Sequence, residues 1–139
     1  METNLKSSEI HERLQSVRDA LLKLHKTLVD SETATYEKTF GKIPSPNHLL
    51  RLLTTDPWFA WLHPISLLIV SMDEALDKKE PLTADKVNAL VKESAAMLVA
   101  SETSEGFARH YFDALQRDPD VVFAHAEAAK LFKPKKTSA

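Results

Sequence analysis

Hydrophobic residues recur at helical spacing along most of this chain, and the first run is the most regular. Its apolar residues alternate steps of four and three: Ile10, Leu14, Val17, Leu21, Leu24 and Leu28. This heptad seam is typical of a long helix that packs on its neighbours at a shallow angle. We predict such a helix from about Ser8 to Thr39, ended by Gly41 in a left-handed conformation. If the helix overhangs its bundle, the seam can pair with a second copy, so a homodimer is expected.

A second run, from Asp56 to Met72, is apolar in nearly every direction around a helix. Its sequence, DPWFAWLHPISLLIVSM, holds both tryptophans of the chain. Asp56 followed by Pro57 is a favoured helix start, so we predict a helix from there to about Leu76, in the middle of the fold. Pro64 lacks the N–H that such a helix needs. Either the helix kinks there, or a short turn ends and a new helix starts at Pro64.

The remaining pattern predicts shorter helices. His48 to Leu53 forms a short one between two proline-containing loops, and later helices begin after Thr83, near Phe107 and at Asp118. With two glycines in 139 residues and 43% hydrophobic residues, the composition favours helix around one core. We therefore predict an all-α fold, a helical bundle of four main helices plus one or two short helices. Residues 1–132 form this single domain, and residues 133–139 form a basic flexible tail.

Composition narrows the function classes. A net charge of -2 argues against a nucleic-acid binder, because that affinity comes mainly from basic residues on phosphates. The central apolar run is shorter than the roughly 20 residues that span a bilayer, so no membrane association is expected. The N-terminus is polar and lacks the apolar core of a signal peptide. The absence of cysteine suits a reducing compartment, and we expect a cytoplasmic protein.

One internal correspondence has two interpretations. His48, Asp56, Pro57 and His63 recur 62 positions later as His110, Asp118, Pro119 and His125. The match is either the remnant of a duplication or chance, because Asp-Pro is a common helix start and other identities are sparse.

No motif for metal or cofactor chemistry is present. Metal-binding bundles repeat Glu-x-x-His pairs or histidines four residues apart, and this chain has neither, so no metal and no cofactor is expected. His110 and Asp113 are three apart on one helix, as in a general base oriented by a carboxylate. An ordinary surface hydrogen bond is the favoured interpretation of that pair, and an enzyme is not the expected class.

A speculative ligand site can be assembled from aromatic and imidazole residues. His63 interrupts the apolar run directly before Pro64, so it either contacts a ligand or haem iron there or satisfies the broken backbone. Trp58, Phe59 and Trp61 either line a pocket, present a patch to a partner, or belong to the core. The candidate ligand-binding residues are Phe59, Trp61, His63, His110 and Tyr111.

Two functions follow from different features. The leading hypothesis is a non-catalytic interaction or regulatory module that binds a protein partner or a second copy of itself. The alternative is a bundle that binds a small apolar ligand or haem near His63. An enzyme that uses His110 or His125 is the least favoured. The run DPWFAWLHPISLLIVSMDEAL resembles a segment of bacterial helical proteins, and this resemblance implies a bacterial cytoplasmic origin without naming an activity or a site.

Overall fold

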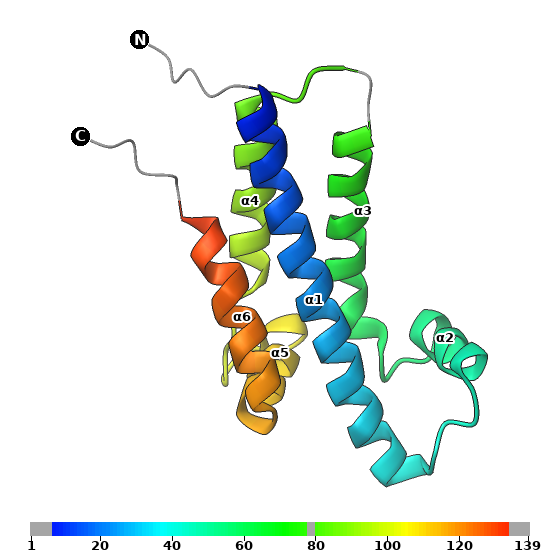
Figure 1. Ribbon diagram of the computed structural model, residues 1–139. Coiled ribbons are helices and arrows are strands. Elements are labelled where there is room, and N and C mark those ends of the chain that lie inside the picture. Colours follow the sequence, from blue (N-terminus) through cyan, green and yellow to red (C-terminus); the bar gives the residue numbers. More distant parts are fainter. Residues whose placement is uncertain (1–6, 78–79, 134–139) are drawn as a thin grey trace.

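The computed structural model describes residues 7–77 and 80–133, and within these ranges it is helical without a strand. The all-α prediction is therefore confirmed. Six α-helices and one 3-10 turn follow each other along the chain: α1 (Ser7–Phe40), α2 (Pro46–Thr55), η1 (Ala60–Leu62), α3 (His63–Asp77), α4 (Ala84–Met97), α5 (Phe107–Arg117) and α6 (Pro119–Phe132). Figure 1 shows α1 running the length of the molecule, with α3 on one side and α4, α5 and α6 on the other. The predicted tail lies outside the described residues from residue 134 onward.

Helix α1 is the central element of this fold. It spans 34 residues, close to the range that the heptad pattern predicts. It ends where Gly41 takes a φ of 92°, a left-handed value that a residue with a Cβ adopts only with strain. The Gly41 N–H donates to the carbonyl of Glu37 at 2.9 Å and so satisfies one of the last carbonyls of the helix.

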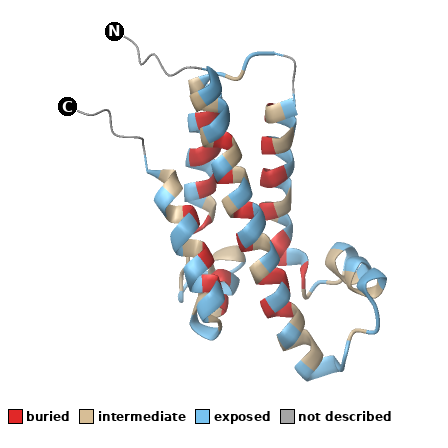
Figure 2. Ribbon diagram, in the orientation of Figure 1, coloured by how far each residue is buried: buried red, intermediate tan, exposed pale blue. Residues whose placement is uncertain are grey.

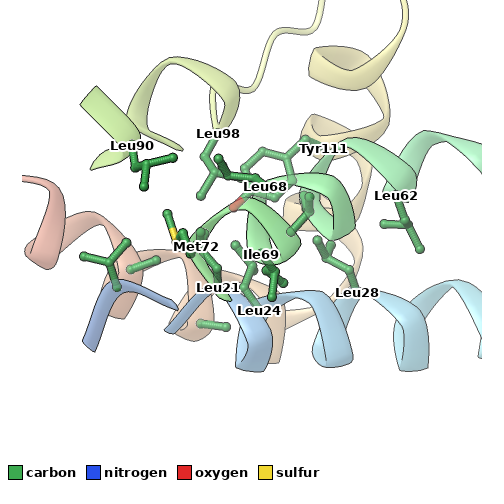
Figure 3. Close-up of a cluster of buried hydrophobic side chains, with 14 of the residues drawn as sticks. Leu21, Leu24, Leu28, Leu62, Leu68, Ile69, Met72, Leu90, Leu98 and Tyr111 are labelled. Carbon is green, nitrogen blue, oxygen red and sulfur yellow. The ribbon is translucent and has the colours of Figure 1, made fainter. Parts of the chain in front are cut away.

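The heptad seam of α1 is buried inside the chain itself. Its members Leu14, Val17, Leu21, Leu24 and Leu28 expose no more than 1% of their surface. They pack against the inner faces of the surrounding helices, where Leu68, Met72 and Tyr111 point toward them (Figure 3). In this single chain, the surface that the seam would offer to a second copy is already covered by the chain's own core. The homodimer stays a prediction.

The second apolar run does not form one central helix. The Asp56 carboxylate accepts a hydrogen bond from the Trp58 N–H at 2.8 Å, which caps a turn rather than a helix. The 3-10 turn η1 follows, and α3 starts at His63, so Pro64 lies in its first turn, where a missing N–H is tolerated. Of the two outcomes predicted for Pro64, the structure has the second, a short turn followed by a new helix.

Helix α3 flanks α1 instead of occupying the middle of the fold. One side of α3 is buried, with Ile65 and Met72 fully covered, whereas Leu67 and Val70 are 54% and 50% exposed on the other side. A long helix presents more sides to its neighbours than a 15-residue helix can, and α1 accordingly contacts α3, α4, α5 and α6. This is why the position expected for α3 belongs to α1.

Polar contacts join α1 to α3 and to the end of α5. Arg18 donates to Asp73 of α3 at 2.7 Å, and His25 Nε2 lies 2.9 Å from the Ser66 hydroxyl of the same helix. On the opposite side, Arg117 at the end of α5 forms an ion pair with Glu32, a largely buried carboxylate. Because Arg117 supplies the opposite charge, the largely buried carboxylate of Glu32 is not left as an unpaired charge.

Helix α2 projects from the bundle at the end where α1 stops (Figure 1). Ser45 caps it by accepting from the His48 N–H at 3.1 Å. It carries no buried residue, in contrast to every other α-helix of the described chain (Figure 2). Helices α2 and α5 are similar in length, and an Asp-Pro pair follows each of them. The two pairs are 62 positions apart, as in the sequence correspondence. The surroundings of the two helices differ, since α5 buries Tyr111 and Ala114.

Within the described ranges, no single helix is both long and apolar enough to cross a bilayer. Only the bent combination of α2 with residues 60–77 reaches the required length and composition, and its two halves meet at 77°. The second half supplies the buried face of α3 against α1, which accounts for its apolar composition.

Candidate functional site

The structure separates the five residues that the sequence singled out. Phe59, Trp61 and Tyr111 are buried, whereas His63 and His110 are exposed. Of the interpretations open for Phe59, its exposed fraction of 1% places it in the core. Three of the five meet in one cluster, one belongs to a second cluster, and His63 belongs to neither.

The first group, here called the inner aromatic cluster, joins η1 to α5 and α6. Its members are Trp61, Phe107, His110, Tyr111 and His125. The Trp61 ring stacks on the His110 imidazole, with centroids 5.3 Å apart and planes 16° from parallel. Phe107 lies 5.4 Å from Trp61 and stacks at 5.5 Å on Tyr111. The structure thus brings together three of the candidate ligand-binding residues, Trp61, His110 and Tyr111. Their rings pack directly on each other or on Phe107.

A short hydrogen bond closes the inner aromatic cluster. The Tyr111 hydroxyl lies 2.6 Å from His125 Nδ1. Burial raises the pKa of Tyr111 far above 10, so the phenol keeps its proton and donates to the imidazole. Burial also lowers the pKa of His125, which favours the neutral ring with its own proton on Nε2. This hydrogen bond between a neutral donor and a neutral acceptor links α5 to α6. A structural role explains it without a substrate.

His110 does not form the pair with Asp113 that the sequence suggested. Asp113 instead forms an ion pair with Arg109 at 3.2 Å, one turn earlier on the same helix. The imidazole of His110 lies against the Trp61 ring. The surface hydrogen bond between His110 and Asp113, the favoured interpretation of their spacing, is therefore not formed.

His63 has no contact that would mark a ligand site. Its side chain is exposed, and within residues 7–77 and 80–133 it makes no hydrogen bond, ion pair or ring contact. The described residues also contain no group of three or more histidine or carboxylate side chains that could hold a metal ion. A haem ligand is normally presented on the wall of an apolar cavity, and the position of His63 on the outer surface does not provide one.

A cleft of about 480 Å³ lies between α1 and α6, away from His63, and its walls include Thr27, Ala34, Arg117 and Phe123. A neighbouring groove of similar size continues along the same two helices, where Lys23 of α1 forms an ion pair with Glu127 of α6 at 3.4 Å. Most residues that line the cleft carry a charge or a hydroxyl group, so the cleft suits neither haem nor a small apolar ligand.

A second group, here called the outer aromatic cluster, lies where α1 ends and the turn after α2 begins. Its members are Tyr36, Phe40, Trp58 and Phe59. Tyr36 contacts the other three rings, at centroid distances of 4.8 Å to Phe40, 5.7 Å to Trp58 and 5.5 Å to Phe59. Phe40 also meets Trp58 edge to face at 5.7 Å. The cluster grades from a core side chain, Phe59, to a surface side chain, Phe40.

One feature sets the outer aromatic cluster apart from the inner one. Phe40 is 63% exposed although it is a large aromatic residue. The Trp58 indole N–H is buried without a hydrogen-bond acceptor among the described residues, but so is the Trp61 indole N–H of the inner aromatic cluster. The exposed Phe40 ring is therefore the distinguishing feature of this end of the molecule.

Sequence analysis identified only half of this cluster. Trp58 and Phe59 were among the aromatic residues singled out there, whereas Tyr36 and Phe40 were not. Their spacing of four places both rings on one face of α1, and this spacing is the signal that would have found them.

The fold and these two clusters define an all-α bundle with a buried aromatic junction and an exposed aromatic surface at one end. Comparisons with models of protein families, with curated proteins and with solved structures give no match. The function is therefore inferred from the residues of this chain alone.

Proposed function

We propose that this protein is a non-catalytic interaction module whose outer aromatic cluster binds a protein partner. The observation that carries the proposal is the exposed Phe40 ring packed on Tyr36 and Trp58. Aromatic residues are enriched where proteins bind each other, and a few of them at the centre of an interface supply most of its binding energy.

The position of the cluster supports this role. Single exposed apolar residues are ordinary on protein surfaces and need no explanation. Here the exposed ring continues into buried rings, so a partner that covers Phe40 extends an existing packed cluster. Rigid rings lose little conformational entropy on binding, which favours recognition.

The alternative of a small apolar ligand or haem near His63 has less support. This alternative depends on a cavity beside Pro64 that the His63 side chain faces. The His63 side chain is exposed, and the cleft described above lies between α1 and α6. The inner aromatic cluster is occupied by its own packed rings. Native mass spectrometry of untagged protein from its own host tests this alternative directly, because an added mass of small-molecule size would favour it over the interaction module.

The proposal is tested by comparing two exposed phenylalanines. Phe40→Ala removes the exposed member of the outer aromatic cluster, and Phe123→Ala removes an equally exposed ring of α6, at 68% against 63%, that belongs to no aromatic cluster. Affinity purification from the source cells with quantitative mass spectrometry should recover a partner with the wild type and with Phe123→Ala, but not with Phe40→Ala. The same dependence should appear between the purified proteins in isothermal titration calorimetry.

Light scattering of the same variants separates a foreign partner from a second copy. A dimer that dissociates only in Phe40→Ala identifies the partner as the protein itself. The proposal is wrong if every interaction of the wild type survives Phe40→Ala unchanged while both variants retain their helical circular dichroism.

A further inference from the structure

The surface next to the outer aromatic cluster has an uneven charge. Residues 39–55, here called the arm, comprise the last residues of α1, the loop after it and α2. The arm contains two cations, Lys42 and Arg51, and no aspartate or glutamate, although the whole chain has a net charge of -2. Both cationic residues are exposed. Neither forms an ion pair or a side-chain hydrogen bond among the described residues.

The carboxylates that flank the arm do not offset these charges through contact. Glu37 accepts from the Ile43 N–H at 2.7 Å, and Asp56 accepts from the Trp58 N–H at 2.8 Å. Both side chains are therefore committed to shaping the backbone on either side of α2. The exposed charges of the arm are therefore both positive: Lys42, two residues after Phe40, and Arg51 on α2.

On the basis of the interaction role proposed above, we infer that the outer aromatic cluster and the arm bind an acidic protein segment with an apolar anchor. The anchor packs on the exposed Phe40 ring. Acidic residues beside the anchor pair with Lys42 and Arg51. Complementary charge of this kind accelerates encounter and selects against basic partners.

A peptide suits this surface better than an anionic lipid bilayer does. A helix that lies on a membrane presents a broad apolar stripe outward. In α2, Leu49, Leu52 and Leu53 are partly covered and pack toward the core, and the outward face carries one large apolar residue, Leu50, which is 60% exposed. Asn47, Arg51 and Thr54 share that outward face. One leucine among polar residues anchors a peptide contact but not a bilayer.

Selection of short random peptides on the full-length protein tests the inference. The enriched peptides should carry net negative charge around an aromatic or branched aliphatic residue. Their affinity is then measured by fluorescence anisotropy for a charge-reversed variant, Lys42→Glu with Arg51→Glu, and for Phe40→Ala. We expect a loss of at least about tenfold for each, and a weaker affinity of the wild type at high salt.

Matched controls separate charge at the arm from charge in general. Lys86→Glu with Lys92→Glu reverses two other exposed lysines on α4, and Phe123→Ala removes a distant exposed ring. Both should bind the selected peptides as the wild type does. Circular dichroism of all variants confirms that they remain folded.

Each other outcome overturns the inference. The acidic partner is ruled out if the enriched peptides are neutral or basic, or if they bind the charge-reversed variant equally well. The proposed interaction role is retained in that case if Phe40→Ala still abolishes binding. If the peptides bind Phe40→Ala as tightly as the wild type, both the acidic partner and the interaction role of the outer aromatic cluster are ruled out. A selection that enriches no peptide counts against the acidic segment. Sedimentation with phosphatidylserine vesicles that depends on Lys42 and Arg51 would assign the surface to a lipid instead.

Discussion

Tyr111 is the residue that combines the most complete burial with a polar group. Its hydroxyl donates to His125 from a side chain that exposes none of its surface. Removing one partner of such a bond leaves the other without its match, and this costs more than the bond itself contributes. The pair therefore stabilises the junction of α5 and α6 only while both members are present.

Tyr111→Phe removes the hydroxyl and keeps the ring. We expect the free energy of unfolding to fall by about 1 kcal/mol, because His125 Nδ1 loses its donor. Urea denaturation measures this change. Tyr36→Phe is the matched control, since the Tyr36 hydroxyl makes no hydrogen bond among the described residues, and it should change stability by a few tenths of a kcal/mol at most. Equal effects of the two variants would contradict the role assigned to Tyr111.

The two partly buried histidines predict a pH dependence. Burial lowers the pKa of both His25 and His125 from the value of 6.5 for a free side chain. The folded protein therefore binds fewer protons than the unfolded chain once the pH falls below 6.5. The stabilisation is complete above that pH and is lost as the pH falls toward the folded-state pKa.

Urea denaturation at about pH 7 and about pH 5 tests this prediction. Wild-type stability should be lower at the acidic pH, and the decrease should be smaller in the double variant His25→Gln, His125→Gln. An identical decrease in both proteins would show that other groups cause the pH dependence.

At the scale of the elements, proline decides where the second apolar run becomes a helix. Pro64 lies in the first turn of α3, where a backbone N–H has no intrahelical acceptor, so the missing N–H of proline costs no hydrogen bond. The turn at Asp56 and η1 lead into this start and place Trp58 and Trp61 in different clusters. Had the run been one helix, both rings would have shared a single face of it.

Pro64→Ala distinguishes a helix start from a kinked helix. Because the new N–H at this position has no intrahelical role, we expect a change in stability within about 0.5 kcal/mol and the same helical content by circular dichroism. Val70→Pro, in the exposed middle of α3, is the control and should cost about 3 kcal/mol. A gain in helical content with Pro64→Ala would instead indicate that the proline interrupts a continuous helix.

For the whole molecule, the decisive choice is where the heptad seam packs. The seam of α1 is covered by helices of the same chain, so the bundle completes its core without a second copy. What remains for assembly lies elsewhere, at the outer aromatic cluster and the arm. The exposed Phe40 ring, on which the proposed interface depends, lies outside this core, so it can be changed without changing the seam.

Two adjacent leucines test this arrangement. Leu21→Ala removes a fully buried seam residue and should lower the free energy of unfolding by about 2–5 kcal/mol. Leu22→Ala, where the side chain is 43% exposed, should cost under about 1 kcal/mol. If the seam packs within the chain, the Leu21→Ala effect stays the same over a roughly hundredfold range of protein concentration. A dependence on concentration would show that the seam is shared between copies.

The sequence was most informative where local physics decides the outcome. The period of the apolar residues specified α1, Gly41 specified its end, and Thr83 and Asp118 marked the caps of α4 and α6. These features depend on neighbours in the chain, so they can be deduced without knowing the fold. Membership of the inner aromatic cluster was partly predictable for the same reason, because large aromatic residues usually find the core.

By itself, therefore, the sequence determined the all-helical class, most helix boundaries and the residues that seek burial. Tertiary structure alone decided which helix occupies the centre, that α2 stands away from the bundle, and which rings meet. It placed Phe40 on the surface at the edge of a packed aromatic cluster and left His63 exposed. The physical reason is that burial depends on contacts between residues distant in sequence, and a helical period states which face is apolar without stating what will cover it.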